Sequence, residues 1–389
     1  MPWNTIATAA AILSRQFDRP VQLESTDTIR HNNRSTVLRC RVVDAPADIP
    51  ASVVVKQIVG GPNEVYDADQ AEGPAARLLN EWAGLQFLGQ VGGEPPFAPR
   101  FYGGDRKRGV VVMEDLGTGA QINDLLWKKD PVEAQRGLVK FAEVFGKMQA
   151  RTVGKKEEYD RIRNLLGPRP DQPRDRIHRW VHDRFTTACS SVAVPLPAGF
   201  DEAVCRIVEF CLCPGPFSVY VHGDSFPGND LLVGKGVRLI DFEYGEFGHA
   251  LIDGVFARFH FPYCWKINRL PDAVVSKTEE AYRRELGKTC PQALDDACFY
   301  RAAVEAYAYW LVNLFSFVTR DVLLCDDKGG AAAWQKKLLL HLDILAADAE
   351  RFGHLEALGS MAGGIAAKLR LLWPEEAQQM PYYPAFQRS

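Results

Sequence analysis

The sequence of 389 residues lacks any apolar run approaching the roughly 18 residues that a membrane-spanning helix needs. It also lacks a strong charge of either sign, since its formal net charge is −3. It therefore has no basic field that would attract nucleic acid or an anionic membrane surface. The first residues lack the basic segment of a secretion signal. We expect a cytoplasmic protein that binds neither nucleic acid nor a membrane.

The nine cysteines lack the spacing of a metal site. Cys211 and Cys213 form the only tight pair, and no second pair or histidine follows at zinc-finger spacing. We therefore expect reduced and buried cysteines.

Two kinds of periodicity divide the chain. Apolar and charged residues alternate over residues 38–42, which predicts a half-buried strand, and residues 52–59 and 110–113 read as more apolar strands. Residues 78–88 have the apolar spacing of one strong helix, and helical spacing dominates the later chain, for example over residues 131–151. The patterns indicate an α+β protein of two lobes.

A run of polar residues in the later half carries the clearest chemical signal. Asp224 follows a short strand-like segment in the triplet His-Gly-Asp, Asn229 lies five residues further on, and Asp241 twelve residues beyond that. In phosphoryl transfer an aspartate orients or deprotonates the acceptor hydroxyl, while an asparagine and a second aspartate hold magnesium against the phosphates. These three residues supply those groups in that order.

The spacing within this run also predicts a local fold. Gly234 and Gly236 lie between two short apolar segments, which indicates a hairpin that brings Asp241 back towards Asn229. Oxygen ligands suit magnesium, which keeps several waters and takes few protein ligands. The triplet alone would fit a loop with a capping aspartate, but the extended pattern favours a magnesium-dependent kinase.

Two residues of the first lobe test this interpretation. Lys56 ends an otherwise apolar strand, which is typical of the kinase lysine that contacts phosphates and pairs with a helix glutamate. At about 100° per residue, Glu81 falls inside the apolar helix face that contains Leu78 and Leu85. A buried carboxylate is costly unless it is paired, so Lys56 is the expected partner. The alternative is that both side chains reach water.

These residues resemble the signature of the aminoglycoside phosphotransferase and choline kinase superfamily, which is similar to HGDxxxxN followed by a strand ending in IDFE. Here the two parts read HGDSFPGN and LIDFE. The resemblance extends to VVVK, to Asn80-Glu81, to VVMEDLG and to GHALID, and covers residues ~20 to ~320. It implies a bilobal protein-kinase-like fold.

The resemblance also implies roles for single residues. Asp224 would be the catalytic aspartate, and Asn229 and Asp241 the magnesium ligands. Asp253 resembles the aspartate that braces the catalytic loop, with an exposed helix cap as the alternative, and His222 looks structural. The residues expected to contact the nucleotide are Lys56, Glu81, Ser35, Met113, Glu114 and Leu116, the last three in a linker whose backbone meets the adenine.

The chain departs from the kinase pattern in two places. The turn over residues 28–35 lacks glycine, although protein kinases cover the phosphates with a glycine-rich loop. Arg30, Arg34 or Ser35 could supply donors there, and a solvated basic turn is the alternative. Asp230, directly after Asn229, is expected to face solvent.

The segment after residue 243 lacks the elements that dock a polypeptide, namely the glycine of a DFG motif, a long activation segment and an Ala-Pro-Glu triplet. We therefore expect ATP, with GTP left open, as phosphoryl donor and a small-molecule hydroxyl as acceptor. The alternative is a nucleotide-binding pseudokinase that acts as an interaction module. The sequence leaves the oligomeric state open.

The acceptor itself would be selected in the later helical region, where carboxylates and aromatic side chains mix. Carboxylates would suit an aminoglycoside and an aromatic cage would suit choline, while core packing and solvation explain them equally. A sugar or another amino alcohol also stays open. The candidates are Glu246, Asp272, Glu279, Glu305, Phe259, Tyr263, Trp265, Tyr309 and Trp310.

The expected lobe boundary follows Leu116, where Gly117-Thr118-Gly119 forms a flexible link. Residues 1–116 would form a small nucleotide-binding lobe with an antiparallel sheet and one helix. Residues 117–389 would form a larger, mainly helical lobe with the catalytic loop, the metal site and the acceptor pocket. The tail over residues 353–389 could pack on this lobe or hang free.

Overall fold

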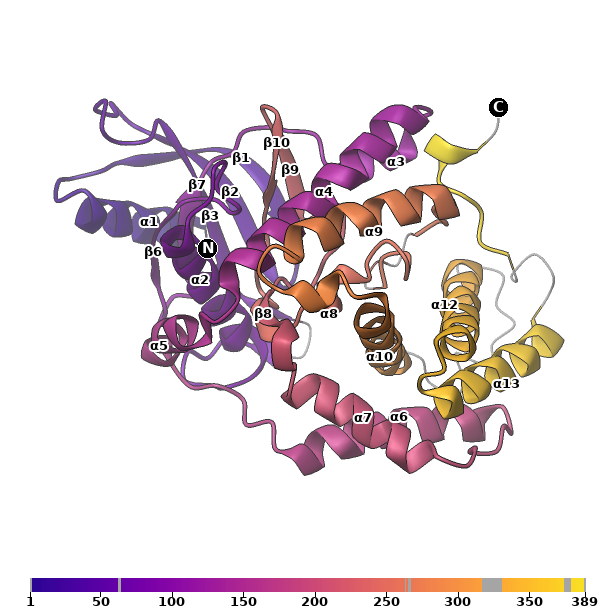
Figure 1. The fold of residues 1–389 in the computed structure, drawn as a ribbon. Helices are drawn as coiled ribbons and strands as arrows, with labels where there is room; N and C mark the ends of the chain where they lie inside the picture. The colour runs from indigo at the N-terminus through magenta and orange to yellow at the C-terminus, as the bar shows by residue number, and fades with distance from the viewer. Residues whose placement is uncertain are drawn as a thin grey trace.

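The computed structural model describes residues 2–61, 64–262, 264, 267–316, 331–373 and 379–387. A sheet-based lobe and a larger helical lobe lie side by side (Figure 1). The expected α+β class is therefore confirmed. The boundary after Leu116 stays a prediction.

The first lobe is built on an antiparallel sheet of five strands in the order β1-β2-β3-β7-β6. Val53 and Val55 point to one face of the central strand, and Lys56 points to the other face with Val54. Both faces are covered, which explains why this strand is apolar almost throughout. The strands are β1 (Leu23–His31), β2 (Ser35–Val42), β3 (Ser52–Ile58), β6 (Phe101–Asp105) and β7 (Val110–Glu114), beside a two-residue pair, β4 (Gly60–Gly61) and β5 (Glu64–Val65).

The sequence predicts one helix in this lobe, and the described part of residues 1–116 has two. Helix α1 (Pro2–Gln16) buries Ala9, Ile12 and Leu13 against the sheet face that carries Val53 and Val55. These three positions have the spacing of an amphipathic helix, so the signal was present in the sequence. The correction makes the sheet a middle layer between α1 and α2 (Gly73–Val91).

Helix α2 comes very close to the second lobe at Gly84. A Cβ there would lie 2.0 Å from the Tyr220 hydroxyl oxygen and 3.4 Å from the Phe242 Cβ. Glu81 lies one turn earlier on the same helix and is buried. Glycine at this position therefore sets how closely the helix that carries Glu81 approaches the catalytic segment.

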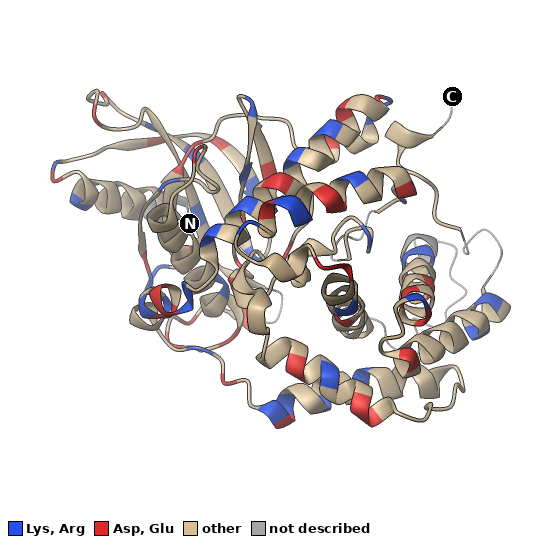
Figure 2. Cartoon of the chain, viewed as in Figure 1, with Lys and Arg blue, Asp and Glu red and all other residues tan. Residues whose placement is uncertain are grey.

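The second lobe is mainly helical. Helix α4 packs along α9, and α12 packs along α13. Basic and acidic side chains alternate along α4 and α9 (Figure 2), and Arg284 Nη2 lies 2.8 Å from Glu143 Oε1 between them. The helices are α3 (Ile122–Trp127), α4 (Pro131–Thr152), α5 (Lys156–Leu166), α6 (Arg174–Ser191), α7 (Phe200–Leu212), α8 (Leu251–Gly254), α9 (Asp272–Leu286), α10 (Asp296–Phe315), α12 (Ala331–Phe352) and α13 (Glu356–Leu372), with short 3-10 turns at Gly215–Phe217, Pro291–Ala293 and Pro384–Phe386.

Two small strand pairs carry the polar motif. Strand β8 (Ser218–Val221) pairs with β11 (Glu246–His249), and β9 (Asp230–Val233) pairs with β10 (Gly236–Leu239). The predicted hairpin is confirmed, and the Ile240 N–H donates to the Asn229 carbonyl at 2.9 Å. The chain therefore enters Asp241 directly beside Asn229.

The described end of the chain packs back on the second lobe. The Arg269 N–H donates to the Pro381 carbonyl at 2.7 Å, and the Tyr383 N–H donates to the Arg269 carbonyl at 3.1 Å. Tyr383 is buried, and its ring meets Trp127 edge-on at a centroid distance of 5.6 Å. A free-hanging tail is therefore wrong for residues 379–387.

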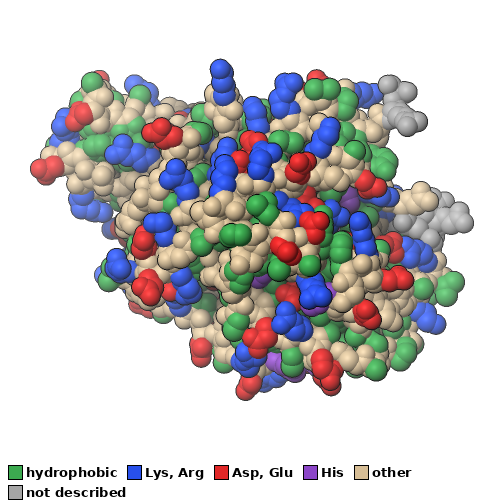
Figure 3. Space-filling model, viewed as in Figure 1, with side chains coloured by type: hydrophobic (Ala, Val, Ile, Leu, Met, Phe, Trp, Pro, Cys, Tyr) green, Lys and Arg blue, Asp and Glu red, His purple; other side chains and the backbone are tan. Residues whose placement is uncertain are grey.

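The eight described cysteines are reduced thiols. The expectation of burial is wrong for Cys205, Cys213 and Cys298, which are exposed, while Cys211 and Cys264 are partly buried and Cys325 lies outside the described residues. Acidic and basic side chains are interspersed over the face drawn in Figure 3. Within the described ranges, no helix is long and apolar enough to cross a membrane.

We expect Gly84→Ala to lower the free energy of unfolding by about 1–3 kcal/mol, because the added methyl group overpacks the contact with Tyr220. Gly89→Ala on the same helix is the matched control. No heavy atom lies within 4 Å of its Cβ position, so this variant should gain about 0.5–1 kcal/mol. Urea unfolding measures both values. Equal effects of the two substitutions would contradict the close approach.

Candidate active site

Two adjoining cavities lie where the lobes meet. One, of about 540 Å³, is lined by the linker after β7 and by Lys56. The other, of about 610 Å³, is lined by Asp224 and by residues of α3 and the later chain. The two cavities share Arg30, Gly228, Asn229 and Asp241. Two molecules bound one in each cavity would therefore meet at Asn229 and Asp241.

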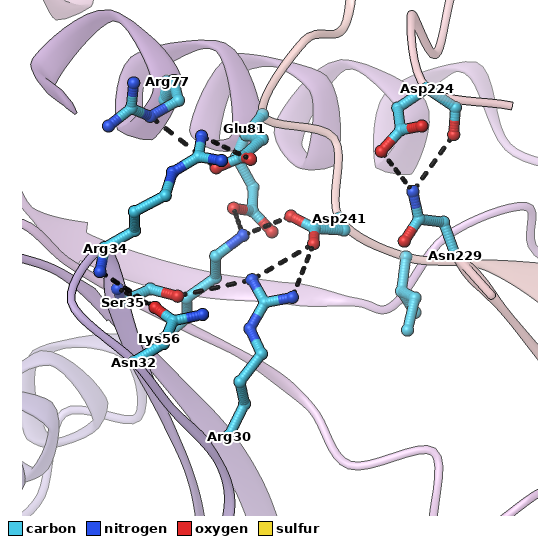
Figure 4. Close-up of polar contacts among 12 residues, drawn as sticks. Arg30, Asn32, Arg34, Ser35, Lys56, Arg77, Glu81, Asp224, Asn229 and Asp241 are labelled. Atoms are coloured by element: carbon cyan, nitrogen blue, oxygen red, sulfur yellow. Dashed lines mark hydrogen bonds and ion pairs between the residues drawn. The ribbon is translucent and has the colours of Figure 1, made fainter. Parts of the chain in front are cut away.

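A buried ion cluster joins the lobes at this junction (Figure 4). The Lys56 Nζ lies 2.5 Å from Glu81 Oε2 and 2.5 Å from Asp241 Oδ1. The side chains of Lys56 and Glu81 are only 4% and 1% exposed. The expected pairing is present, and the alternative in which both side chains reach water is wrong.

Two of the three groups in the cluster, Lys56 and Asp241, are charged at neutral pH. Burial alone would lower the pKa of Lys56, but the carboxylates of Asp241 and Glu81 raise it. Burial raises the pKa of Glu81 to about 7 although Lys56 opposes the shift. Burial acts in the same direction on Asp241, but Lys56 and Arg30 outweigh it and lower its pKa to about 2. An ammonium group and an ionised Asp241 therefore face each other at neutral pH.

His222 lies beneath the loop that carries Asp224. Its Nε2 lies 2.9 Å from the Ile240 carbonyl, and its Nδ1 accepts the Asp224 N–H at 3.3 Å. Nε2 must therefore carry the ring proton. Burial lowers the pKa of His222 to about 4, so the ring is neutral and links the loop to the segment after β10. These contacts agree with the structural role expected for it.

Asp253 at the end of α8 holds the same loop from behind. Its Oδ2 accepts the His222 N–H at 2.7 Å, and its Oδ1 accepts the Gly223 N–H at 3.0 Å. The Gln149 side-chain amide donates to Oδ2 at 3.1 Å. Asp253 is fully buried, and this burial raises its pKa to about 7. The exposed-cap alternative is wrong, and the carboxylate fixes the backbone just before Asp224.

Asp224 and Asn229 are hydrogen-bonded to each other. The Asn229 Nδ2 donates to Asp224 Oδ2 at 2.8 Å and to the Asp224 carbonyl at 3.1 Å. Since its amide nitrogen is used in this way, the carbonyl oxygen Oδ1 is the atom of Asn229 left to bind another group. Burial raises the pKa of Asp224 to about 6, against the opposing hydrogen bond from Asn229.

The oxygen atoms at the junction fit a magnesium ion. Among the described residues, no group of three or more His, Cys, Asp and Glu side chains could hold a metal by itself. Asn229 Oδ1 and the Asp241 carboxylate are nevertheless hard oxygen ligands, and magnesium takes its other ligands from water and phosphates. Both oxygens of Asp241 already accept from cations, Lys56 at Oδ1 and Arg30 at Oδ2. Positive charge is therefore favourable at this position.

The end of β7 and the linker after it line the 540 Å³ cavity through Met113, Glu114 and Leu116, and their contact with adenine stays a prediction. Sequence reasoning missed the contact that holds the linker. Arg39 Nε lies 2.9 Å from Asp115 Oδ2, and the Gly117 N–H donates to Asp115 Oδ1 at 2.9 Å. An arginine in a half-buried strand was the available signal, because such a charge needs a partner.

Asp230 was expected to face solvent, but the structure places it in the interior. It is fully buried, and its Oδ2 accepts the Ile122 N–H at 3.1 Å at the start of α3. The first N–H groups of a helix have no partner within the helix, so a carboxylate is favourable there. Burial raises the pKa of Asp230 to about 8. The residue joins β9 to α3 and does not face solvent.

The glycine-free turn between β1 and β2 faces the cleft. Ser35 is buried, and its Oγ accepts from Arg30 Nη2 at 3.3 Å. Arg34 Nη2 lies 3.3 Å from Glu243 Oε1 and donates to the Tyr244 hydroxyl at 3.0 Å. Both arginines have partners in the second lobe, but their side chains are 45% and 43% exposed, so the phosphate contacts and the alternative of a solvated basic turn both stay predictions. Ser35 lines the cavity of Asp224 rather than that of the linker.

Two of the carboxylates expected to select the acceptor form ion pairs with arginines. Glu279 pairs with Arg258 at 2.5 Å, and Glu305 pairs with Arg206 at 2.5 Å. None of the candidates described by the structure lines the cavity beside Asp224. Tyr263 and Trp265 lie outside the described residues. The residues of the second lobe that line that cavity include instead Asn123, Trp127, Phe226, Tyr244 and Cys264.

Residues 44–287 match the model of the phosphotransferase enzyme family, which is more than half of the 389 residues. No curated protein matches the sequence significantly.

Solved structures with similar folds include three kinases of small molecules. An ethanolamine kinase from Plasmodium vivax is 12% identical, with a TM-score of 0.43, 84% of this chain covered and 82% of that chain. A choline kinase from Cryptosporidium parvum is 11% identical, with a TM-score of 0.43 and 90% of each chain covered. An aminoglycoside phosphotransferase in complex with ADP and hygromycin B is 13% identical, with a TM-score of 0.42, 93% of this chain covered and 98% of that chain. At this level of similarity, the family assignment rests on the sequence match alone.

We expect Lys56→Met to lower the free energy of unfolding by about 3–5 kcal/mol, because it leaves the buried Glu81 carboxylate without its partner. Adding Glu81→Leu to this variant should recover most of that loss, since both buried charges are then removed. Urea unfolding of the single and double variants measures the coupling. Losses that simply add would contradict a buried pair.

Proposed function

The chain belongs to the phosphotransferase enzyme family, and from this membership we propose that it transfers the γ-phosphoryl group of ATP to a hydroxyl group of a small molecule. One observation carries the proposal: the two cavities meet at Asn229 and Asp241, with Lys56 in one and Asp224 in the other. GTP as donor is compatible with the same geometry. Residues 1–116 would supply the nucleotide side, and residues 117–389 the catalytic and acceptor side.

On the donor side, the backbone of Met113, Glu114 and Leu116 would meet the adenine. The contacts of Asp115 with Arg39 and Gly117 support this assignment, because they fix the course of the linker. Lys56, held in place by Glu81, would direct its ammonium group to the phosphates. The nucleotide would then point from the linker towards the shared junction.

On the acceptor side, Asp224 would orient the acceptor hydroxyl and accept its proton. Asn229 holds one carboxylate oxygen of Asp224, and the loop before it is held by Asp253 and His222. Such fixed geometry matters because phosphoryl transfer is catalysed mostly by positioning and charge neutralisation. The proton would pass from the acceptor hydroxyl to an Asp224 oxygen as the acceptor oxygen bonds to the γ-phosphorus, while the bond from that phosphorus to the β–γ bridging oxygen breaks and ADP leaves.

Asn229 and Asp241 would hold magnesium. When bound, the ion neutralises charge on the transferred phosphoryl group. Asp241 is suited to this role because Lys56 keeps it ionised. Its backbone has the left-handed φ of 68°, which an aspartate tolerates and which turns the chain out of β10 at this point.

The acceptor should be a small molecule, because the sequence after residue 243 lacks the elements that dock a polypeptide. The cavity beside Asp224 combines aromatic side chains, Trp127 and Phe226, with polar ones such as Asn123. This mixture suits a sugar, an aminoglycoside or an amino alcohol.

We expect Asp224→Asn to reduce phosphoryl transfer by about 10²–10⁴-fold while ATP affinity stays within a few fold, because the amide cannot accept the proton. Mass spectrometry of products formed from ATP, magnesium and a panel of aminoglycosides, choline, sugars and homoserine measures transfer, and thermal shift measures binding. Full transfer by the variant would contradict the role of Asp224. Binding by the wild type without any product across the panel would favour the pseudokinase alternative.

The raised pKa of Asp224, about 6, predicts the pH profile. The protonated carboxyl cannot accept a proton, so kcat/KM should fall about tenfold per pH unit below 6 and level off above it. The residual activity of Asp224→Asn should lack the transition near pH 6. A wild-type midpoint near pH 4 would contradict the effect of burial.

A further inference from the structure

We propose that Arg30 binds the phosphate groups of the nucleotide, and that its guanidinium leaves Asp241 for those phosphates when the nucleotide arrives. This inference rests on the proposed function and adds a specificity residue to it. The hairpin that carries Arg30 precedes residue 44, where the family match begins. Its role therefore has to be argued from the contacts of this chain.

Two backbone N–H groups of the turn already have hydrogen-bond partners within the turn. In a glycine-rich loop, backbone N–H groups close to the phosphates supply much of the binding. Here the side-chain carbonyl of Asn32 accepts the N–H groups of Arg34 at 2.9 Å and of Ser35 at 2.8 Å. These two donors are used inside the turn and are not available to a phosphate, which favours a side-chain donor.

Arg30 is the side chain in the right place. It lines both cavities and lies at their junction, together with Asn229 and Asp241. Figure 4 shows its guanidinium directed at Asp241, where it contacts Oδ2 while Lys56 contacts Oδ1. A planar guanidinium binds phosphate oxygens through two parallel hydrogen bonds, which makes arginine well suited to this task.

The present partner of Arg30 holds it only loosely. Both Nη1 and Nη2 lie 3.4 Å from the single oxygen Oδ2 of Asp241, longer than a close charge-assisted hydrogen bond. The Arg30 side chain is 45% exposed, and such pairs contribute little. Lys56 stays 2.5 Å from Oδ1, so Asp241 keeps a cation when Arg30 moves. Moving the Arg30 guanidinium from Asp241 to the phosphates therefore costs little free energy, and it frees Asp241 Oδ2.

Arg34 on the same turn contacts the second lobe and does not reach the junction of the cavities. It lines only the cavity of Asp224, and it contacts Glu243 and the Tyr244 hydroxyl. It therefore anchors the turn to the second lobe while Arg30 reaches the junction. Arg34 is a positioning residue in this arrangement.

The test is the affinity of Arg30→Ala for ATP and for adenosine, measured by calorimetry with magnesium present. Loss of a charge-assisted contact should weaken ATP binding by at least about tenfold. Adenosine has no phosphate, so its affinity should change by less than about twofold. Arg41→Ala is the matched control, because Arg41 lies on the same hairpin in an exposed pair with Glu24, and it should leave both affinities unchanged.

Two results would overturn the inference alone: Arg30→Ala binds ATP as tightly as the wild type, or it loses affinity for adenosine in the same proportion as for ATP. In both cases the wild type still binds ATP, so the proposed function stands. A wild type that fails to bind ATP would overturn the proposed function and this inference with it.

Discussion

The ion cluster of Lys56, Glu81 and Asp241 is the interaction on which the site depends. It joins the central strand β3, the helix α2 and the segment after β10 in one buried contact, with both distances from the amine at 2.5 Å. Buried charges are costly alone, so any arrangement that separates these elements leaves a charge without a partner. The same contact therefore holds the lobes together and keeps Asp241 ionised at the junction of the cavities.

A second buried carboxylate, that of Asp253, fixes the loop on the other side of the junction. Asp253 accepts backbone N–H groups of His222 and Gly223, and the His222 ring accepts the N–H of Asp224. Gly223 is needed here, because it has a φ of 77° and a Cβ would lie 2.5 Å from the Tyr244 carbonyl oxygen. The reactive carboxylate is thus placed by backbone contacts, whereas the donor side is placed by an ion cluster.

Local patterns in the sequence predicted much of this site, and contacts between distant segments explain what they missed. Asp224, Asn229 and Asp241 fall in one short segment whose hairpin can be read from its glycines, and Glu81 is visible as a charge in an apolar helix face. The contact of Asp230 with Ile122 spans 108 residues, and that of Arg30 with Asp241 spans 211. The periodicity of a sequence does not predict contacts between such distant residues, so Asp230 was expected to face solvent. The acceptor candidates failed for a related reason, since ion pairs and core packing account for Glu279, Glu305 and Phe259.

The central claim is that a phosphoryl group crosses from one cavity to the other at Asn229 and Asp241. The most direct measurement follows ATP labelled in its γ-phosphoryl group in the presence of the protein, magnesium and a panel of small hydroxyl compounds. The account predicts that the label appears as a phosphate ester on a hydroxyl of one class of compound. Label that stays in ATP, or passes only to water across the whole panel, while ATP is bound, would contradict it.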